Sequence, residues 1–164
     1  MKLLTTNVLI ITLLCLLTGC PYESEHSLGQ IQNIDPNLIK TWKGKQINFE
    51  DDEWIIEVTD FNDKEYLVDL KIRRKGAVQS YKMRAFVSKI GSNNILHFQS
   101  LMPPTEHRTF NYIKYRLESE KLVVRFLKKN DETRRLNSKN ELSKYIMRNL
   151  NDEKAWSKSI ILKK

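Results

Sequence analysis

Apolar and polar residues alternate along most of the chain, in short segments that turn residues separate. The clearest segment is 65–73, where apolar side chains fall on one face and charged ones on the other, with Leu67 as the apolar exception. A period of two predicts an antiparallel strand with one buried and one wet side. Residues 79–87 repeat the pattern, and the intervening Lys75-Gly76-Ala77 predicts a hairpin turn. We expect further strands at 42–49, 53–60, 94–101, 109–118, 121–128 and 159–162.

One helix interrupts this series of strands. Ser138 and Glu141 have the spacing of a capping box, and apolar residues then recur at helical intervals from Leu142 to Leu150. We expect the helix to pack its apolar stripe on the outside or at one end of the sheet. The whole pattern predicts a mainly all-β fold. It is an antiparallel meander of seven or eight strands forming a small barrel, with one C-terminal α-helix followed by a last strand.

The first twenty residues contain a long apolar run. Lys2 precedes an apolar segment that is too short to span a bilayer, and small residues follow it, which is typical of a secretory signal peptide. Leu17-Thr18-Gly19-Cys20 resembles the lipobox of bacterial lipoproteins. The resemblance implies that residues 1–19 are removed and that Cys20 carries diacylglycerol and an N-acyl chain such as palmitate. A buried N-terminal helix that happens to end in Gly-Cys is the alternative interpretation.

A lipidated Cys20 would hold the protein in the membrane of a bacterial cell envelope. Pro21 stands where an aspartate would favour the inner membrane of enterobacteria, so the outer membrane is favoured in a cell that has one. Cys15 would leave with the signal peptide, so no internal disulfide could form. Residues 20–33 are polar and aperiodic, and we expect a lipidated flexible tether there. A single β-barrel domain is then expected at 34–164.

Residues 35–43 carry a second resemblance. Asp35-Pro36 predicts a short helical turn capped by Asp35, and Trp42 follows at the start of the first strand. This opening resembles that of the lipocalin-like (calycin) barrels, although Lys40 stands where that family has glycine. The resemblance implies that Trp42 is a structural plug at the closed end of the barrel. Arg125 is a candidate for the late arginine that packs over this tryptophan in the family.

The barrel interior is the expected binding site. An eight-stranded barrel has the size at which its interior is either filled by side chains or holds one small ligand. The side chains expected on the inward faces are bulky, and both a filled interior and a ligand cavity stay open. The resemblance implies a membrane-anchored protein that binds a small hydrophobic or amphipathic ligand or has an accessory role in the envelope. The expected ligand-binding residues are Tyr66, Val68, Leu70, Tyr81, Met83, Phe98 and Tyr115.

The charge distribution favours a different function. The formal net charge is +8, and it becomes +7 once Lys2 is removed and the new N-terminal amine is acylated. Residues 22–63 carry 3 basic and 10 acidic side chains, whereas residues 121–164 carry 13 basic and 5 acidic ones. The acidic run 50–53 and the basic run 71–75 are expected to mark opposite or mutually attracting loops. The alternative function is an interaction module whose basic surface binds anionic lipid, glycan or a protein partner, unless that surface is merely solvated.

The sequence contains no recognisable catalytic constellation. The three histidines lack metal-ligand spacing, and there is no Gly-rich phosphate loop or Gly-x-Ser-x-Gly elbow. Asp51-Asp52-Glu53 is predicted to be an exposed hairpin turn and Glu106-His107-Arg108 a surface loop. We expect a monomeric, non-enzymatic protein with no metal, no nucleic-acid partner and no cofactor beyond its covalent lipid. An enzyme would instead need polar groups that converge inside the barrel, such as Glu57, His97 and Lys114.

Overall fold

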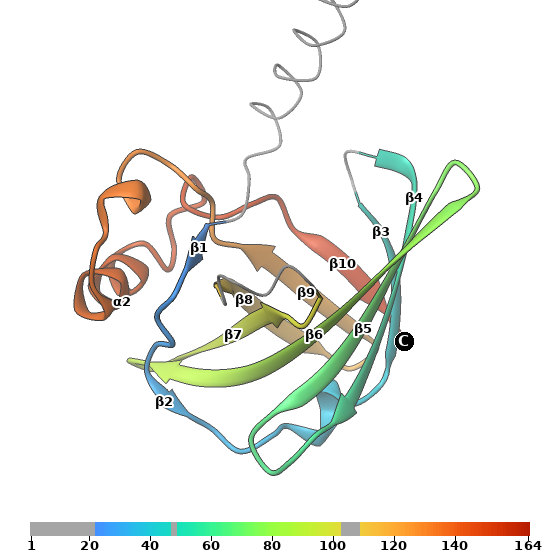
Figure 1. Cartoon of the computed structure of the whole chain (residues 1–164), viewed down its shortest axis with the longest axis horizontal. Helices are drawn as coiled ribbons and strands as arrows, with labels where there is room; N and C mark the ends of the chain where they lie inside the picture. The colour runs from blue at the N-terminus through green and yellow to red at the C-terminus, as the bar shows by residue number, and fades with distance from the viewer. Residues whose placement is uncertain (1–21, 47–48, 103–108) are drawn as a thin grey trace, which may run out of the picture.

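Eight antiparallel strands close into a barrel (Figure 1). The computed structural model describes residues 22–46, 49–102 and 109–164, without the side chains of residues 46 and 49–51. Each strand pairs with the next along the chain, and the last one closes the barrel between β9 and β3. This arrangement confirms the predicted fold class. The strands are β3 (Thr41–Gln46), β4 (Phe49–Asp60), β5 (Tyr66–Arg74), β6 (Ala77–Ile90), β7 (Asn93–Ser100), β8 (Phe110–Glu118), β9 (Lys121–Phe126) and β10 (Ile160–Lys163).

Residues with unusual backbone requirements stand where strands turn or meet. Lys75 and Gly76 have φ angles of 47° and 83°, the left-handed values that a two-residue turn between β5 and β6 requires. Gly44 of β3 pairs with Leu162 of β10, and a Cβ at Gly44 would lie 2.6 Å from the carbonyl oxygen of Ile161. The close approach of β10 to β3, which completes the barrel, therefore depends on a residue without a side chain.

The strand register sends alternate side chains to the inside and the outside of the barrel. The inward side chains pack into what we call the inner cluster. Half-buried residues such as Trp54, Met83 and Phe98 pack against it. The buried members of the inner cluster are Leu38, Trp42, Tyr66, Val68, Ala85, Val87, Leu96, Ile113, Leu122, Val124, Ile160 and Leu162.

A second apolar cluster lies on the outside of β6, β7 and β8, under helix α2 (Lys139–Arg148) (Figure 1). The helix begins at Ser138, whose hydroxyl accepts a hydrogen bond from the Glu141 N–H at 3.2 Å, which confirms the predicted cap. The helix packs on the outside of the barrel, one of the two expected positions. We call this the outer cluster, and its members are Tyr22, Leu28, Phe86, Ile90, Ile95, Phe110, Tyr112, Leu127, Leu142, Tyr145, Ile146, Ala155 and Trp156.

Residues 22–33, which we call the strap, cross the outside of the barrel. Within the strap, β1 (Glu23–Ser24) pairs with the start of β8, and β2 (Gln30–Ile31) pairs with the end of β6. Leu28 has no exposed surface, and the Tyr112 hydroxyl donates a hydrogen bond to the His26 carbonyl. The expectation of a flexible tether is therefore wrong from Tyr22 onward, because two apolar side chains fix this polar segment to the barrel. Residues 20 and 21 lie outside the described residues.

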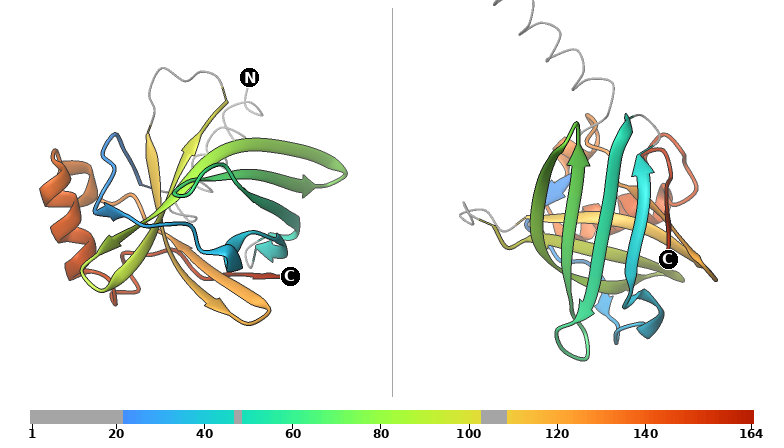
Figure 2. Two further views of the ribbon diagram at one scale, coloured as in Figure 1. Left: turned by 90° about the horizontal axis from the view of Figure 1, so that it is seen from below. Right: turned by 90° about the vertical axis from the view of Figure 1, so that its right-hand side faces the viewer.

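The two ends of the barrel carry different elements. The short helix η1 (Pro36–Leu38) and the β4–β5 turn lie at one end, and the β5–β6 hairpin extends beyond the other (Figure 2). β1 lies towards the hairpin end (Figure 1). Just before β1, the Tyr22 N–H donates to the Leu127 carbonyl at 2.8 Å, just past the end of β9. On the side away from α2, the outer faces of β5, β4, β3 and β10 are covered by no other described element (Figure 2). We call these faces the bare wall.

Candidate functional site

One end of the barrel is closed by a hydrogen-bonded plug. Asp35 caps η1 as predicted, and its carboxylate accepts from the Asn37 N–H at 2.9 Å. The Trp42 indole N–H donates to the Leu38 carbonyl at 3.0 Å, and the Tyr66 hydroxyl accepts from the Asp35 N–H at 2.6 Å. Both rings are buried. We call this the closed end.

Trp42 is fully buried at the closed end, and one contact that the lipocalin-like resemblance implies for it is absent among the described residues. Lys40 lies over its ring, with the ammonium nitrogen 5.8 Å from the ring centroid, which is a cation–π distance. The Nε of Arg125 instead donates to the Ser157 carbonyl at 2.8 Å. Arg125 faces outward because its neighbour Val124 faces inward, so the expectation that Arg125 packs over Trp42 is wrong.

The inner cluster becomes more accessible towards the other end of the barrel. Along β5, the inward side chains change from buried Val68, 3% exposed, to half-buried Leu70. Along β6, they change from Ala85, 1% exposed, through half-buried Met83 to Tyr81, 37% exposed. Solvent therefore reaches the inward face near the β5–β6 hairpin, and we call this the open end.

All seven predicted ligand-binding residues face inward. The register pairs Val68 with Met83 and Leu70 with Tyr81, and it pairs Tyr115 with inward Val124. Two of the seven, Tyr66 and Val68, are buried at the closed end, and the Tyr66 hydroxyl is already bonded to the backbone before η1. Their part in binding stays a prediction. The five members with accessible surface are Leu70, Tyr81, Met83, Phe98 and Tyr115.

Two of the inward-facing phenols, those of Tyr66 and Tyr115, are held neutral. Burial raises the pKa of Tyr115 to about 12, with smaller contributions from Tyr66 and Asp35. Burial also raises the pKa of Tyr66. These groups can therefore offer hydrogen bonds but no charge to a molecule inside the barrel.

Two polar atoms inside the barrel are buried without a hydrogen-bond partner among the described residues. They are the Trp54 indole nitrogen and the Asn111 side-chain oxygen. Trp54 pairs with Gly44 and Asn111 pairs with Phe98, so both side chains point inward. A buried polar group left unpaired costs about 1–3 kcal/mol. The pair supplies the interior with one free donor and one free acceptor.

Trp54 and Asn111 are not among the site residues predicted from the sequence. Both lie in strands that were predicted, at 53–60 and 109–118, and their parity within those strands places them on the inward face. The alternation of inward and outward positions along these strands therefore already places both residues on the inward face. A polar residue at an inward position, as at Asn111, is the pattern that would have found one of them.

A serine and a histidine also meet, but in the outer cluster. Ser88 Oγ lies 2.6 Å from His97 Nε2, and neither side chain has exposed surface. The His97 ring stacks on Phe86 with centroids 4.6 Å apart, and its Nδ1 has no partner among the described residues. Burial, and to a lesser extent Lys139, lowers the pKa of His97 to about 3. The neutral, enclosed pair is packed as part of the core.

The three polar residues that would indicate an enzyme do not converge. Glu57 lies exposed on the bare wall, paired with Thr41, while His97 is enclosed in the outer cluster. The Lys114 ammonium donates to the Leu150 carbonyl at 2.6 Å. All three side chains point away from the barrel interior. His97 and Lys114 lie on the neighbouring strands β7 and β8, whereas Glu57 lies on β4 of the bare wall.

The acidic and basic runs attract each other across β4 and β5. Arg74 binds Asp52 with two nitrogens, Nε at 2.9 Å from Oδ1 and Nη2 at 2.6 Å from Oδ2. Arg73 lies 2.8 Å from Glu53. Residues 51–53 belong to β4 and Asp52 is only 2% exposed, so the prediction of an exposed turn there is wrong. Of the two expected arrangements, the structure has the mutually attracting one.

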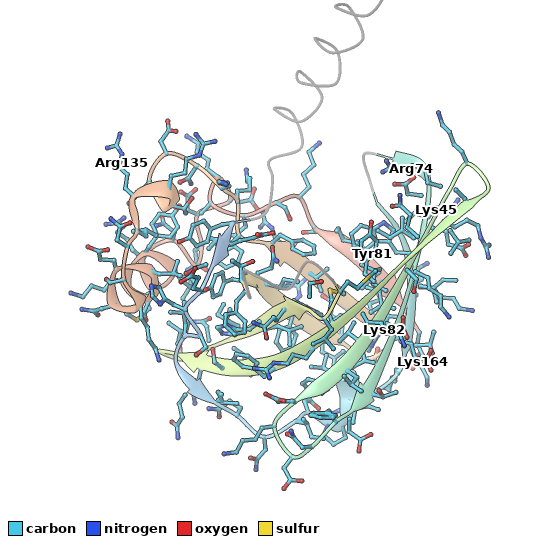
Figure 3. The ribbon with its side chains drawn as sticks, in the orientation of Figure 1. Lys45, Arg74, Tyr81, Lys82, Arg135 and Lys164 are labelled. Atoms are coloured by element: carbon cyan, nitrogen blue, oxygen red, sulfur yellow. The ribbon has the colours of Figure 1, made fainter. Side chains whose placement is uncertain are left out.

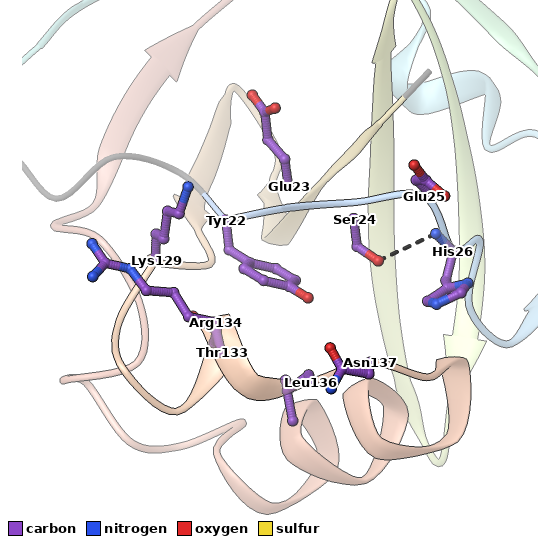
Figure 4. Close-up of a pocket in the computed structure, with 10 residues that line it drawn as sticks. All are labelled: Tyr22, Glu23, Ser24, Glu25, His26, Lys129, Thr133, Arg134, Leu136 and Asn137. Carbon is purple, nitrogen blue, oxygen red and sulfur yellow. Dashed lines mark hydrogen bonds between the residues drawn. The ribbon is translucent and has the colours of Figure 1, made fainter. Parts of the chain in front are cut away.

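A surface pocket of about 630 Å³ lies between the strap and the segment that leads to α2 (Figure 4). The strap contributes Glu23 and Glu25, and the opposite side contributes Lys129 and Arg134. Inside the pocket, Ser24 Oγ accepts from the His26 N–H at 3.2 Å. The charges of its two sides balance, so the pocket favours no single class of ligand.

The remaining sequence predictions concern metals, membranes and positions beyond the described ranges. Cys20 and the run 106–108 lie outside the described residues. Within residues 22–46, 49–102 and 109–164, no group of three or more His, Cys, Asp and Glu side chains is placed to hold a metal ion. In the same part of the chain, no helix has the length and apolar character needed to cross a bilayer.

No family model matches the sequence, and neither a curated protein nor a solved structure is similar enough to count as a match.

Proposed function

We propose that this protein is a bacterial envelope lipoprotein, anchored through Cys20, whose lipocalin-like barrel binds a small amphipathic molecule through its open end. The observation that carries this proposal is a donor on Trp54 and an acceptor on Asn111, both buried on the inward face and without a partner in the part of the chain that the structure describes. A buried polar atom without a partner is a strained arrangement unless something else completes it. A bound polar group would complete both.

The lining of the open half indicates the chemistry of the ligand. Leu70, Met83 and Phe98 offer an apolar wall that is half-buried, and Tyr81 extends it towards the mouth. The ligand would place an apolar body against this wall. Its polar part would accept from the Trp54 indole and donate to the Asn111 amide, as a hydroxyl or an amide does and a carboxylate cannot.

The place where the chain enters the barrel supports a membrane source for this ligand. The strap begins with β1 towards the hairpin end (Figure 1), and Tyr22, just before β1, is two positions after Cys20 in the sequence. Because the strap is packed on the barrel from Tyr22 onward, an anchor on Cys20 would hold the open end close to the bilayer. A membrane amphiphile could then enter the barrel without crossing bulk water.

Ligand binding is tested by what the protein carries when it is purified. The full chain is expressed in bacteria, isolated in a nonionic detergent and examined by native mass spectrometry. We expect an amphiphile to accompany the parent chain. Met83→Trp should abolish its retention by filling the open half, because Met83 faces inward, whereas Lys82→Trp on the outward side of the same strand should retain it. A parent chain that is always empty, or a ligand kept equally by both variants, would overturn ligand binding in the barrel.

The lipid anchor is tested separately. We expect the mature mass to correspond to a chain that starts at Cys20 and carries diacylglycerol and one further acyl chain. Cys20→Ala should move the protein out of the membrane fraction, and Cys15→Ala, in the segment that is removed, should not. An unmodified Cys20 in a protein exported by its native signal would contradict the anchor and leave the barrel experiment unaffected.

A further inference from the structure

A row of lysines crosses the bare wall and the adjoining strand β9, at right angles to the strands. The register places side by side Lys71 of β5, Ile55 of β4, Lys43 of β3, Lys163 of β10 and Lys121 of β9. All four lysines are exposed, and three of them stand on adjacent strands with no other residue between them. Directly opposed residues on one face of a sheet have Cβ atoms about 5 Å apart. We call these four residues the lysine row.

The charges of the lysine row are not compensated in the part of the chain that the structure describes. None of the four lysines lies within ion-pair distance of a described carboxylate. Glu118, the residue opposite Lys121 on β8, is 2.7 Å from Arg116 instead. Like charges placed directly opposite one another destabilise a sheet. The row therefore opposes folding, and a bound anion would relieve it.

The shape of the row distinguishes between possible anions. It crosses five of the eight strands of a closed barrel, so it runs around about half of the circumference. A flat bilayer can touch only a narrow part of such a convex wall, so it cannot meet Lys71 and Lys121 together. A flexible linear chain can follow the wall and meet all four.

We propose that the lysine row binds a linear polymer with repeating phosphate groups, which wraps around the bare wall. Lys43, Lys163 and Lys121 form the centre of this site, and Lys71 extends it. Lys45 and Lys82, labelled on the same side of the molecule in Figure 3, flank the row. The site is separate from the barrel interior, and it would operate whether or not the barrel holds a ligand.

The test compares two variants with the same change in net charge. Lys43→Gln, Lys121→Gln and Lys163→Gln are combined in the row variant, and Lys89→Gln, Lys144→Gln and Lys154→Gln, all exposed and away from the row, in the control. Binding of long-chain inorganic polyphosphate to the full chain in a nonionic detergent is measured against salt. We expect binding by the row variant to be weaker by on the order of 100-fold at low salt, with a salt slope smaller by about 2–3, because each lysine releases counterions. The control should bind nearly as well as the parent.

Stability is measured on the same samples, so that loss of folding is not mistaken for loss of a site. The row variant should unfold at the same or a higher urea concentration than the parent at low salt, because its repulsion is removed. Absence of polyphosphate binding by the parent, or equal losses in both variants, would overturn the proposal. Anionic phosphatidylglycerol vesicles provide the competing outcome. If the row variant loses vesicle binding as strongly as polyphosphate binding, the wall is a membrane surface and the polymer proposal is wrong.

Discussion

The inner and outer clusters are built on opposite faces of the same strands, yet only one of them is sealed. On β6, Ala85 faces inward and Phe86 outward, and both are almost fully buried. The outer cluster is covered along its length by α2 and the strap. The inner cluster is plugged at one end. Towards the other end its side chains become more exposed to solvent, and Tyr81 is 37% exposed there.

Both the outer and the inner side of these strands have buried polar atoms that find no partner among the described residues, and the two cases have different consequences. His97 Nδ1 lies in the sealed outer cluster, where nothing from outside can reach it. Asn111 Oδ1 and Trp54 Nε1 lie on the inward face, which opens to solvent near Tyr81. An unpaired atom in a sealed core can only lower stability, whereas one near an opening can gain stability from a ligand. The comparison therefore indicates a structural role for the outer cluster and supports the ligand binding proposed for the inner one.

The strongest test of this difference removes one tryptophan from each cluster. Trp156 is 1% exposed and its indole N–H donates to the Asn149 carbonyl at 2.9 Å, so Trp156→Ala should lower the free energy of unfolding by about 3–5 kcal/mol. Trp54 is half-buried with an unpaired indole, so Trp54→Ala should cost only about 1–2 kcal/mol. Urea unfolding of the full chain, followed by circular dichroism, measures both. Equal losses would mean that the inner cluster is packed as tightly as the outer one.

The strap tests how the outer cluster is sealed. Leu28 is fully buried, so Leu28→Ala should cost about 2–4 kcal/mol and should increase hydrogen exchange in residues 22–33. Ile31 is 40% exposed in the same segment and serves as the control, with an expected change below about 0.5 kcal/mol for Ile31→Ala. If Leu28→Ala is as mild as the control, residues 22–33 behave as the free tether that their polar composition suggests.

The strap also shows where prediction from the sequence ends. The eight barrel strands and the helix follow from periodicity, because each buries one face and the alternation records which face that is. Tyr22 and Leu28 are two apolar residues in a polar segment, and no period marks them. Their burial depends on a groove that forms only after β6, β7 and β8 have assembled.

The candidate site shows the same limit. The inward lining follows from alternation, so the seven predicted residues lie on the correct face. Sequence alone does not say which of them solvent can reach, because that depends on the plug formed by η1, Trp42 and Tyr66. Nor does it say that Ser88 and His97, on neighbouring strands, meet under the strap. Contacts between strands and coverage by distant segments are properties of the closed barrel.

Acid should weaken the outer cluster through His97. The pKa of His97 is about 3 in the folded protein and about 6.5 in the unfolded chain, so only the unfolded chain takes up a proton between these values. The contribution of His97 to stability is complete above pH 6.5 and is lost as the pH falls. Between pH 7 and pH 4.5 we expect a loss of about 2–3 kcal/mol. The glutamine of the His97→Gln variant does not titrate. Between pH 7 and pH 4.5, the free energy of unfolding of this variant should therefore fall by about 2–3 kcal/mol less than that of the parent. Parallel curves for the two proteins would show that His97 is not buried in its neutral form.

The smallest effect on stability should come from the inner cluster, with the opposite sign. Asn111→Leu replaces a half-buried amide, whose buried oxygen has no partner among the described residues, by an apolar side chain of similar size, so it should raise the free energy of unfolding by about 1 kcal/mol in the empty protein. The same change removes the acceptor proposed for the ligand, so the amount of amphiphile that accompanies the purified chain should fall. Asn151→Leu, at an exposed position, should change neither quantity. A less stable Asn111→Leu with unchanged ligand retention would mean that Asn111 supports the barrel itself. The contrast between a sealed structural cluster and an open binding cluster would then no longer hold at this position.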